Sequence, residues 1–373
     1  MSRRNWVLAG MLALFLLVLA GLLAQPRGST SPREPSPGVS PTGGGASTPL
    51  AESAPLVDAL PDPALGGQLI FDSPEGNLWT MPLALEAAPT PLPKPSSFGL
   101  AFQPVWSPDG ERVAFGYIAP PEQGQPAQGA AIWVMEVATG QARPLYQAED
   151  GGQSSFRDPA WAGDGQAIWA THQTPHFDPA GTFQGMASRV VRIPVDGGEP
   201  VPVTEGRAPA PSPDGTRLAY LVTDPETGKD ELWLAQADGS QPRRLVAGLF
   251  DQLLAPRFSP DGETVAFAAS GQPPQSRAPA PGGGLGSWTA LLAPRPVQAH
   301  GLFTADIWLV QVDGGPPRRL TAIYEDHPTP AWSRDGRWIV FGGIKGLYLV
   351  EVASGRVVRL SDGAIDGQLD WHE

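Results

Sequence analysis

The sequence predicts an all-β protein, a six-bladed β-propeller preceded by an N-terminal transmembrane or signal helix and a disordered linker. Three observations lead to this prediction: a short phrase recurs, the chain is rich in turn-forming residues, and the two ends of the repeat region complement each other. Of 373 residues, 45 are Gly and 44 are Pro, while 41% are hydrophobic. This composition suits a turn-dense β protein and excludes a helical bundle.

The first 24 residues are expected to form an apolar helix. Arg3 and Arg4 precede an uncharged run over 6–24, which is long enough to cross the hydrocarbon core of a bilayer. Three interpretations stay open: a retained signal anchor, a cleaved signal peptide and a twin-arginine export signal. All three place the rest of the chain outside the cytoplasm. We therefore expect a single-pass cell-membrane protein, or a secreted one if the helix is cleaved.

Residues 25–64 are dense in Pro, Gly, Ser and Thr. Such a segment cannot bury enough apolar surface to offset the loss of chain entropy on folding. It is predicted to be a disordered tether that holds a folded domain away from the membrane.

The region 65–373 contains the repeats, and each repeat predicts four short strands. A phrase ending in Asp-Gly precedes a run with the alternation of a half-buried strand, and an aromatic strand, a second Gly turn and a strand carrying Arg-Leu follow. The region therefore predicts a radial array of four-stranded sheets. The first phrase occupies 104–110, 159–165, 209–215, 256–262 and 330–336.

The two ends of this region fix the number of blades. Residues 369–371 match the first strand of the unit with nothing after them, whereas 68–71 match the second strand with nothing before them. Pairing these two segments would close a ring of six blades and remove both exposed sheet edges.

The phrase Pro-x-Trp-Ser-Pro-Asp-Gly, followed by an aromatic strand, Asp-Gly-Gly and Arg-Arg-Leu-Thr, resembles the repeat of TolB-type (WD40-like) propellers. The same repeat occurs in propeller domains of prolyl oligopeptidase-like peptidases. The resemblance implies a propeller, but this fold serves scaffolds, substrate gates and binding modules alike. Because no α/β domain is evident on either side of the repeats, we expect a protein that is not an enzyme.

Composition limits the partners and cofactors. The net charge of −13 disfavours nucleic acid, and the absence of Cys excludes thiolate metal sites and disulfides. No cofactor is expected. The cluster His172, His176 and Asp178 could hold a metal, but we interpret it as part of a surface loop, and we predict no metal site.

Binding residues are expected on the loops that join one blade to the next, around the mouth of the central channel. An ordinary solvated rim is the alternative interpretation of these charges. The candidate rim residues are Arg157, Asp158, Arg207, Asp326, His327 and Asp366.

A second candidate is the insertion over 270–305, which lengthens one blade. Long loops inside compact domains are usually functional or disordered. Its candidate contact residues are Trp288, Arg295, His300 and Asp306.

Together these features predict a monomeric, membrane-tethered binding module or scaffold that contacts a protein, peptide or glycan through its loop-rich face. The alternative is an enzyme, or the regulatory subunit of a hydrolase or peptidase, that uses the channel mouth and perhaps a metal.

Overall fold

The computed structural model describes residues 54–57, 59–85, 87–121, 128–148, 150, 152–271, 304–365 and 367–373. The apolar run at the start of the chain lies outside these residues, so the helix and the membrane anchor stay predictions. In the part of the chain that is described, no helix is long and apolar enough to cross a bilayer.

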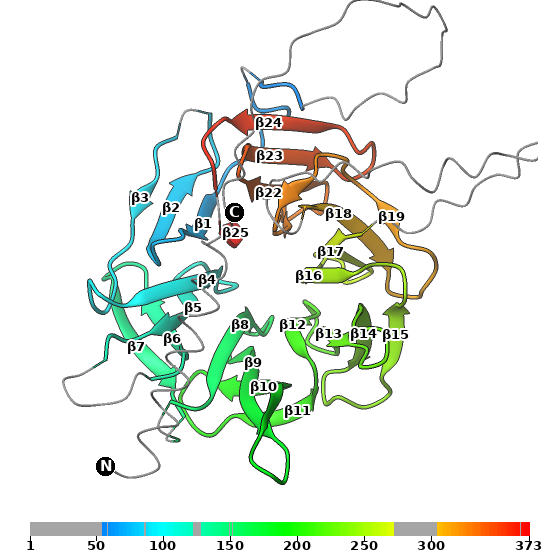
Figure 1. Ribbon diagram of the computed structural model, residues 1–373. Helices are drawn as coiled ribbons and strands as arrows, with labels where there is room; N and C mark the ends of the chain where they lie inside the picture. The colour runs from blue at the N-terminus through cyan, green and yellow to red at the C-terminus, as the bar shows by residue number, and fades with distance from the viewer. Residues whose placement is uncertain are drawn as a thin grey trace, which may run out of the picture. The chain divides into compact units, whose positions relative to one another are not determined.

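Six antiparallel sheets surround a central axis, which confirms the predicted six-bladed propeller (Figure 1). Each sheet is one blade, in which the first-named strand is the innermost and the last-named strand the outermost. Blade 1 contains β25 (Leu369–His372), β1 (Gln68–Asp72), β2 (Leu78–Pro82) and β3 (Thr90–Pro91); blade 2 contains β4 (Leu100–Trp106), β5 (Arg112–Ile118), β6 (Ala131–Glu136) and β7 (Gln141–Tyr146); blade 3 contains β8 (Ser155–Trp161), β9 (Ala167–Phe177), β10 (Phe183–Pro194) and β11 (Val201–Glu205).

The second half of the ring follows the same order. Blade 4 contains β12 (Arg207–Pro211), β13 (Arg217–Thr223), β14 (Asp230–Gln236) and β15 (Arg243–Val246); blade 5 contains β16 (Gln252–Phe258), β17 (Thr264–Ser270), β18 (Thr304–Gln311) and β19 (Arg318–Arg319); blade 6 contains β21 (Ala331–Trp332), β22 (Trp338–Gly343), β23 (Gly346–Glu351) and β24 (Val357–Ser361). The short strand β20 (Glu325–Asp326) pairs with β18.

The two ends of the repeat region close the ring. β25 pairs antiparallel with β1, and the register runs from Gln68 opposite His372 to Phe71 opposite Leu369. The indole Nε1 of Trp371 also donates a hydrogen bond to the Gly66 carbonyl at 2.8 Å. Blade 1 is therefore assembled from both ends of the repeat region.

The turns between the first and second strands explain the recurring Asp-Gly. In blade 2, Asp109 Oδ1 accepts hydrogen bonds from the Glu111 N–H, at 3.0 Å, and from the Ser107 hydroxyl. Gly110 has a φ of 73°, a backbone conformation that residues other than Gly rarely adopt. The same Asp capping recurs at Asp214, Asp261 and Asp335.

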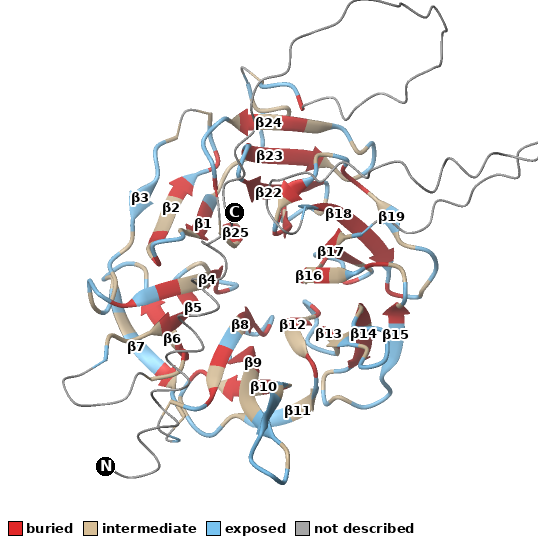
Figure 2. Cartoon of the chain, viewed as in Figure 1, coloured by how far each residue is buried: buried red, intermediate tan, exposed pale blue. Residues whose placement is uncertain are grey.

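The hydrophobic core lies between the blades. Six clusters of buried side chains each draw on two successive blades, and the second and third strands contain most of their members. In Figure 2 the outer strands β3, β7 and β11 are mainly exposed or intermediate. Trp side chains also connect the blades, since Trp161 Nε1 donates to the Val105 carbonyl at 3.2 Å.

The alternation of strands gives the propeller two faces. One face, which we call the turn face, contains the turns from first to second and from third to fourth strands. The opposite loop face contains the loops from second to third strands and those that join successive blades.

Candidate functional site

One residue of each innermost strand, which we call the axial residue, has the same register in all six blades. In blade 2 this residue is Val105, which pairs with Ala114. Its equivalents are Arg257 in blade 5, which pairs with Ala266, and Asp370 in blade 1, which pairs with Ile70. The axial residues are Val105, Ala160, Ala210, Arg257, Ala331 and Asp370.

Two axial residues are charged, whereas the other four are Ala or Val. Arg257 and Asp370 both line a cavity of about 230 Å³ that is bounded by residues of the innermost strands. Pro108 and Pro213, which belong to turns between first and second strands, also line it. The cavity therefore lies at the turn-face end of the channel.

Most N–H donors of the Arg257 guanidinium have no hydrogen-bond acceptor among the described residues. Its Nη1 donates to the Pro256 carbonyl at 3.1 Å, and no other described atom accepts a hydrogen bond from the guanidinium. Burial lowers the pKa of Arg257, and the carboxylates of Asp370 and Asp158 act in the opposite direction. A guanidinium has five N–H donors, so most of them remain available to a ligand.

Asp370 supplies the opposite charge. Its Oδ2 accepts a hydrogen bond from the backbone N–H of Trp106 in the next blade, at 2.8 Å. Burial raises the pKa of Asp370, whereas the Arg257 charge and the Trp106 N–H lower it. The cavity thus presents a cation and a carboxyl group that are not bonded to each other.

Of the rim candidates, Arg157 and Asp158 lie on β8. The Asp158 carboxylate accepts hydrogen bonds from Gln103 Nε2 and from the Thr171 hydroxyl, both at 2.7 Å. It therefore joins blade 3 to blade 2. The exposed Arg157 has its guanidinium 5.5 Å from the ring centre of Phe102.

Arg207 is held in an ion pair. Its Nη2 lies 2.5 Å from Oδ2 of Asp230, a residue that is only 5% exposed. The same carboxylate oxygen accepts a hydrogen bond from the Leu253 N–H at 3.0 Å. Arg207 therefore helps to fasten blade 4 to blade 5.

Asp326 and His327 lie in the connection between blades 5 and 6. Nδ1 of His327 is 2.7 Å from Oδ1 of Asp326, and Asp326 pairs with Thr304 at the start of β18. Asp366 lies outside the described residues. The described rim candidates thus form three groups, at β8, at β12 and at this connection.

Among the insertion candidates, Trp288, Arg295 and His300 lie outside the described residues. Asp306 is 4% exposed; it accepts a hydrogen bond from the Ile323 N–H at 2.8 Å and pairs with Arg319. These contacts stabilise the chain after β19. Whether any rim or insertion residue binds a partner stays a prediction.

The segment with His172, His176 and Asp178 is an extended hairpin of β9 and β10, rather than the loop that was expected. Phe177 and Phe183 pack edge to face across its end, at 5.9 Å between ring centres. The His172 ring stacks on Phe156, and burial lowers the pKa of His172. Over the described residues, no group of three or more acidic or His side chains is arranged to hold a metal ion.

Sequence analysis missed Arg257 and Asp370, although a signal for them was present. The recurring phrase has a small apolar residue before its aromatic position in blades 2, 3, 4 and 6, but Arg in blade 5 and Asp in the closing strand. Comparing that single position between copies would have identified both residues.

No family model matches the chain. A curated relative from Bacillus subtilis (strain 168) is named "Uncharacterized peptidase YuxL", and this chain is 28% identical to it over 207 residues. The match covers 50% of this chain and 29% of the relative, so the chain spans less than a third of that protein. The name of this relative overturns the expectation that the protein is not an enzyme.

Solved structures share the fold at low sequence identity. TolB from Acinetobacter baumannii has a TM-score of 0.56 at 14% identity, and the match covers 82% of this chain and 66% of that one. A chain of a nidogen/laminin complex has a TM-score of 0.53 at 11% identity, with 82% of this chain and 98% of that one covered. The fold of this protein is therefore that of a TolB-type six-bladed β-propeller, as the repeat phrase predicted.

Proposed function

We propose that the protein binds a polypeptide partner at the turn-face end of its channel, outside the cytoplasm and tethered by its apolar N-terminal segment. The observation that carries this proposal is the pair of opposite charges at the axial positions. Arg257 has unused donors beside the cavity, and Asp370 offers a carboxyl group. A polypeptide can supply a carboxylate and an ammonium or amide group together, whereas a neutral glycan supplies no charge.

The size of the cavity limits what can enter. At about 230 Å³, it has room for one side chain or one chain end, but not for a folded segment. The remaining contacts would come from the surface around it. The similar propeller in the nidogen/laminin complex supports a partner of the protein class.

The test is covalent capture from native membranes with the full chain. Cross-linked partners of the wild type are identified, and the yield of each is compared with that of Arg257→Gln and Arg257→Glu. We expect at least a tenfold loss with Arg257→Glu, which corresponds to about 1.4 kcal/mol. Arg356→Ala, an exposed Arg in the β23–β24 turn, is the matched control. Equal capture by the wild type and Arg257→Glu would contradict the proposal.

A second candidate function is that of a propeller module of a peptidase, and the similarity to the peptidase-named relative supports it. Its test is the hydrolysis of fluorogenic peptides by the purified full chain. Turnover whose KM rises with Arg257→Gln at unchanged kcat would favour substrate binding in the channel. If KM and kcat are both unchanged by Arg257→Gln, the activity does not depend on the channel site.

A further inference from the structure

Three of the seams between blades share one hydrogen bond. An Arg from the outermost strand of one blade donates to the carbonyl of the residue that follows the third strand of the next blade. The bonds join Arg143 to Val195, Arg243 to Val312, and Arg318 to Val352.

Each of these Arg residues also has the same kind of cross-strand neighbour, which is an apolar residue of the third strand. The pairs are Val134 with Arg143, Leu234 with Arg243, and Leu309 with Arg318.

Blade 3 has the two residue types exchanged. Arg192 occupies the third strand and pairs with Val201 on the outermost strand. The seam between blades 3 and 4 therefore has no Arg placed to reach the carbonyl of Ala237, which follows the third strand of blade 4. The neighbour of Arg192 on β9 is Trp169, at the register where blade 2 has Ala114.

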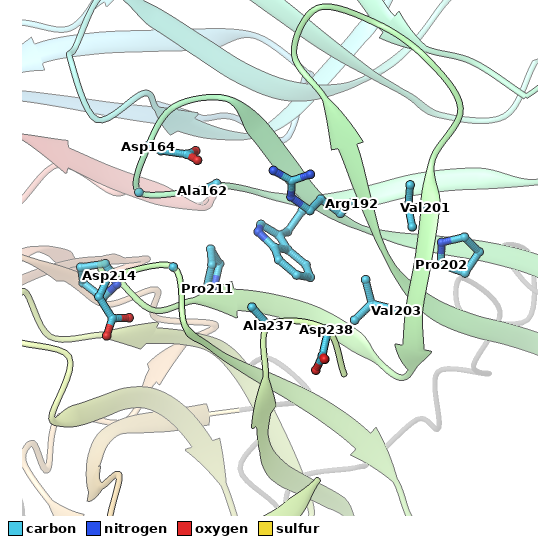
Figure 3. Close-up of a pocket in the computed structure, with 14 residues that line it drawn as sticks. Ala162, Asp164, Arg192, Val201, Pro202, Val203, Pro211, Asp214, Ala237 and Asp238 are labelled. Carbon is cyan, nitrogen blue, oxygen red and sulfur yellow. The ribbon is translucent and has the colours of Figure 1, made fainter. Parts of the chain in front are cut away.

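A pocket of about 710 Å³ lies at this seam, lined by Arg192, Trp169, Val201 and Ala237 among others (Figure 3). Half of the eight buried residues in the core of this seam are Ala, so few large side chains fill it.

Two tight backbone contacts join blades 3 and 4 near the pocket. A Cβ on Gly163 would lie 2.1 Å from the Pro213 carbonyl oxygen, and a Cβ on Gly239 would lie 2.6 Å from that of Val203. The two blades are thus in close contact at two points near the pocket, which limits how far they can move apart there.

The chemistry of the pocket is amphipathic. No described residue accepts a hydrogen bond from the Arg192 guanidinium or forms an ion pair with it. Three exposed Asp residues also line the pocket (Figure 3). The carboxylate of each accepts a hydrogen bond from a backbone N–H of its own turn, which fixes its position; the three residues are Asp164, Asp214 and Asp238.

We propose that this seam pocket binds the C-terminal end of a polypeptide. The terminal carboxylate pairs with Arg192, an apolar last side chain packs against Trp169 and Val201, and a basic residue upstream faces the rim carboxylates. Charge complementarity carries this assignment, because a cation inside and three anions at the rim match a ligand of the opposite polarity. The pocket adjoins the Arg257 cavity through Gly163, Pro211 and Pro213, but neither Arg257 nor Asp370 lines it, so this inference goes beyond the proposed function.

The test uses the full chain and a fluorescein-labelled peptide, Gly-Ser-Lys-Pro-Val-Leu, with binding measured by fluorescence anisotropy. Two analogues isolate the contacts: one has a C-terminal amide, and the other has Glu in place of Lys. We expect each analogue to bind at least tenfold more weakly than the parent peptide. Arg192→Gln should weaken the parent peptide equally and remove the difference between acid and amide.

Two further variants separate binding from folding. Arg189→Gln, which changes an exposed Arg on the same strand β10, should bind as the wild type does. Exchanging the pair as Arg192→Val with Val201→Arg creates the pattern of blades 2, 4 and 5. It should raise the melting temperature through a new bond to Ala237 and abolish peptide binding.

Several outcomes would overturn the proposal: acid and amide binding equally, Arg192→Gln binding as the wild type does, or no binding by the wild type up to about 1 mM peptide. Displacement of the peptide by an equal concentration of N-acetylleucine would instead make the pocket a site for small carboxylates. Arg257→Gln should leave peptide binding unchanged, so a failure of the channel proposal stays distinguishable from a failure of this one.

Discussion

At the scale of single residues, the positions that depart from the repeat are the ones whose polar groups remain available to a ligand. The carboxylate oxygens of the repeated Asp residues accept hydrogen bonds within their own turns, as Asp109 does from the Glu111 N–H. By contrast, Arg257 and Arg192 each occupy a position where four of the other five blades have an apolar residue, and both retain unused donors.

A turn Asp provides a prediction about pH. Hydrogen bonds from Ser212 and Thr216 lower the pKa of Asp214 from 3.8 to about 2. Because the folded-state pKa is depressed, the stabilisation is present above about pH 4 and is lost as the pH falls towards 2. Asp214→Asn should therefore flatten the fall in melting temperature between pH 4 and 2. The effect should stay below about 1 kcal/mol, since this carboxylate is exposed.

The control is Asp196→Asn, because Asp196 is exposed and its carboxylate has no hydrogen-bond partner among the described residues. Thermal unfolding followed by circular dichroism from pH 5 to 2 measures both variants. Identical profiles for Asp214→Asn and the wild type would show that this turn does not contribute to acid unfolding.

Sequence reasoning located charged residues of the rim and of the insertion but could not show their partners. Arg207 on β12 pairs with Asp230 on β14, with β13 between the two strands, and Asp306 on β18 pairs with Arg319 on the adjacent strand β19. The register between those strands decides such pairs, and the repeat alone does not reveal it. Arg257 was within reach, because its position in the phrase is aligned with that of the other copies.

At the scale of strands and seams, small local differences decide where the ring is tight and where it is open. The hairpin of β9 and β10 was expected to be a loop because Pro and Gly are frequent there. Cross-strand pairing from Ala167 opposite Pro194 outwards extends it instead. The pocket between blades 3 and 4 could not be foreseen from one blade, since it lies between two blades, at a seam that lacks the Arg hydrogen bond found at three other seams.

Gly163 tests how close blades 3 and 4 must approach. Gly163→Ala places a Cβ against the Pro213 carbonyl oxygen, which belongs to backbone that cannot move aside freely. We expect a loss of about 1–3 kcal/mol in unfolding free energy, as for overpacked cores. Denaturant titration measures it.

Gly66→Ala is the matched control, because a Cβ there meets no atom within 4 Å. If both variants are equally stable, the seam can widen without cost, and the contact at Gly163 does not hold blades 3 and 4 together rigidly.

At the scale of the whole molecule, the ring depends on closure by its last strand. The complementary ends of the repeat region allowed the blade count and the pairing of β25 with β1 to be predicted, because only a closed ring pairs both edges. The placement of charge around the axis was harder to predict. It depends on which blade supplies each axial residue, and Arg257 and Asp370 come from blades that are distant in sequence.

Removing the last five residues, 369–373, should therefore destabilise the whole propeller and not only its end. The deletion exposes the edge of β1, removes the buried side chains of Leu369 and Trp371, and leaves the Trp106 N–H without its carboxylate. Deleting one buried Trp side chain alone costs about 3–5 kcal/mol. With roughly 2 °C of melting temperature per kcal/mol for large domains, the midpoint should fall by at least about 6 °C. Trimming Glu373 alone, which keeps β25 intact, should change it by less than about 2 °C. A truncated chain that melts as the wild type does would mean that the five other blades hold the ring without its closing strand.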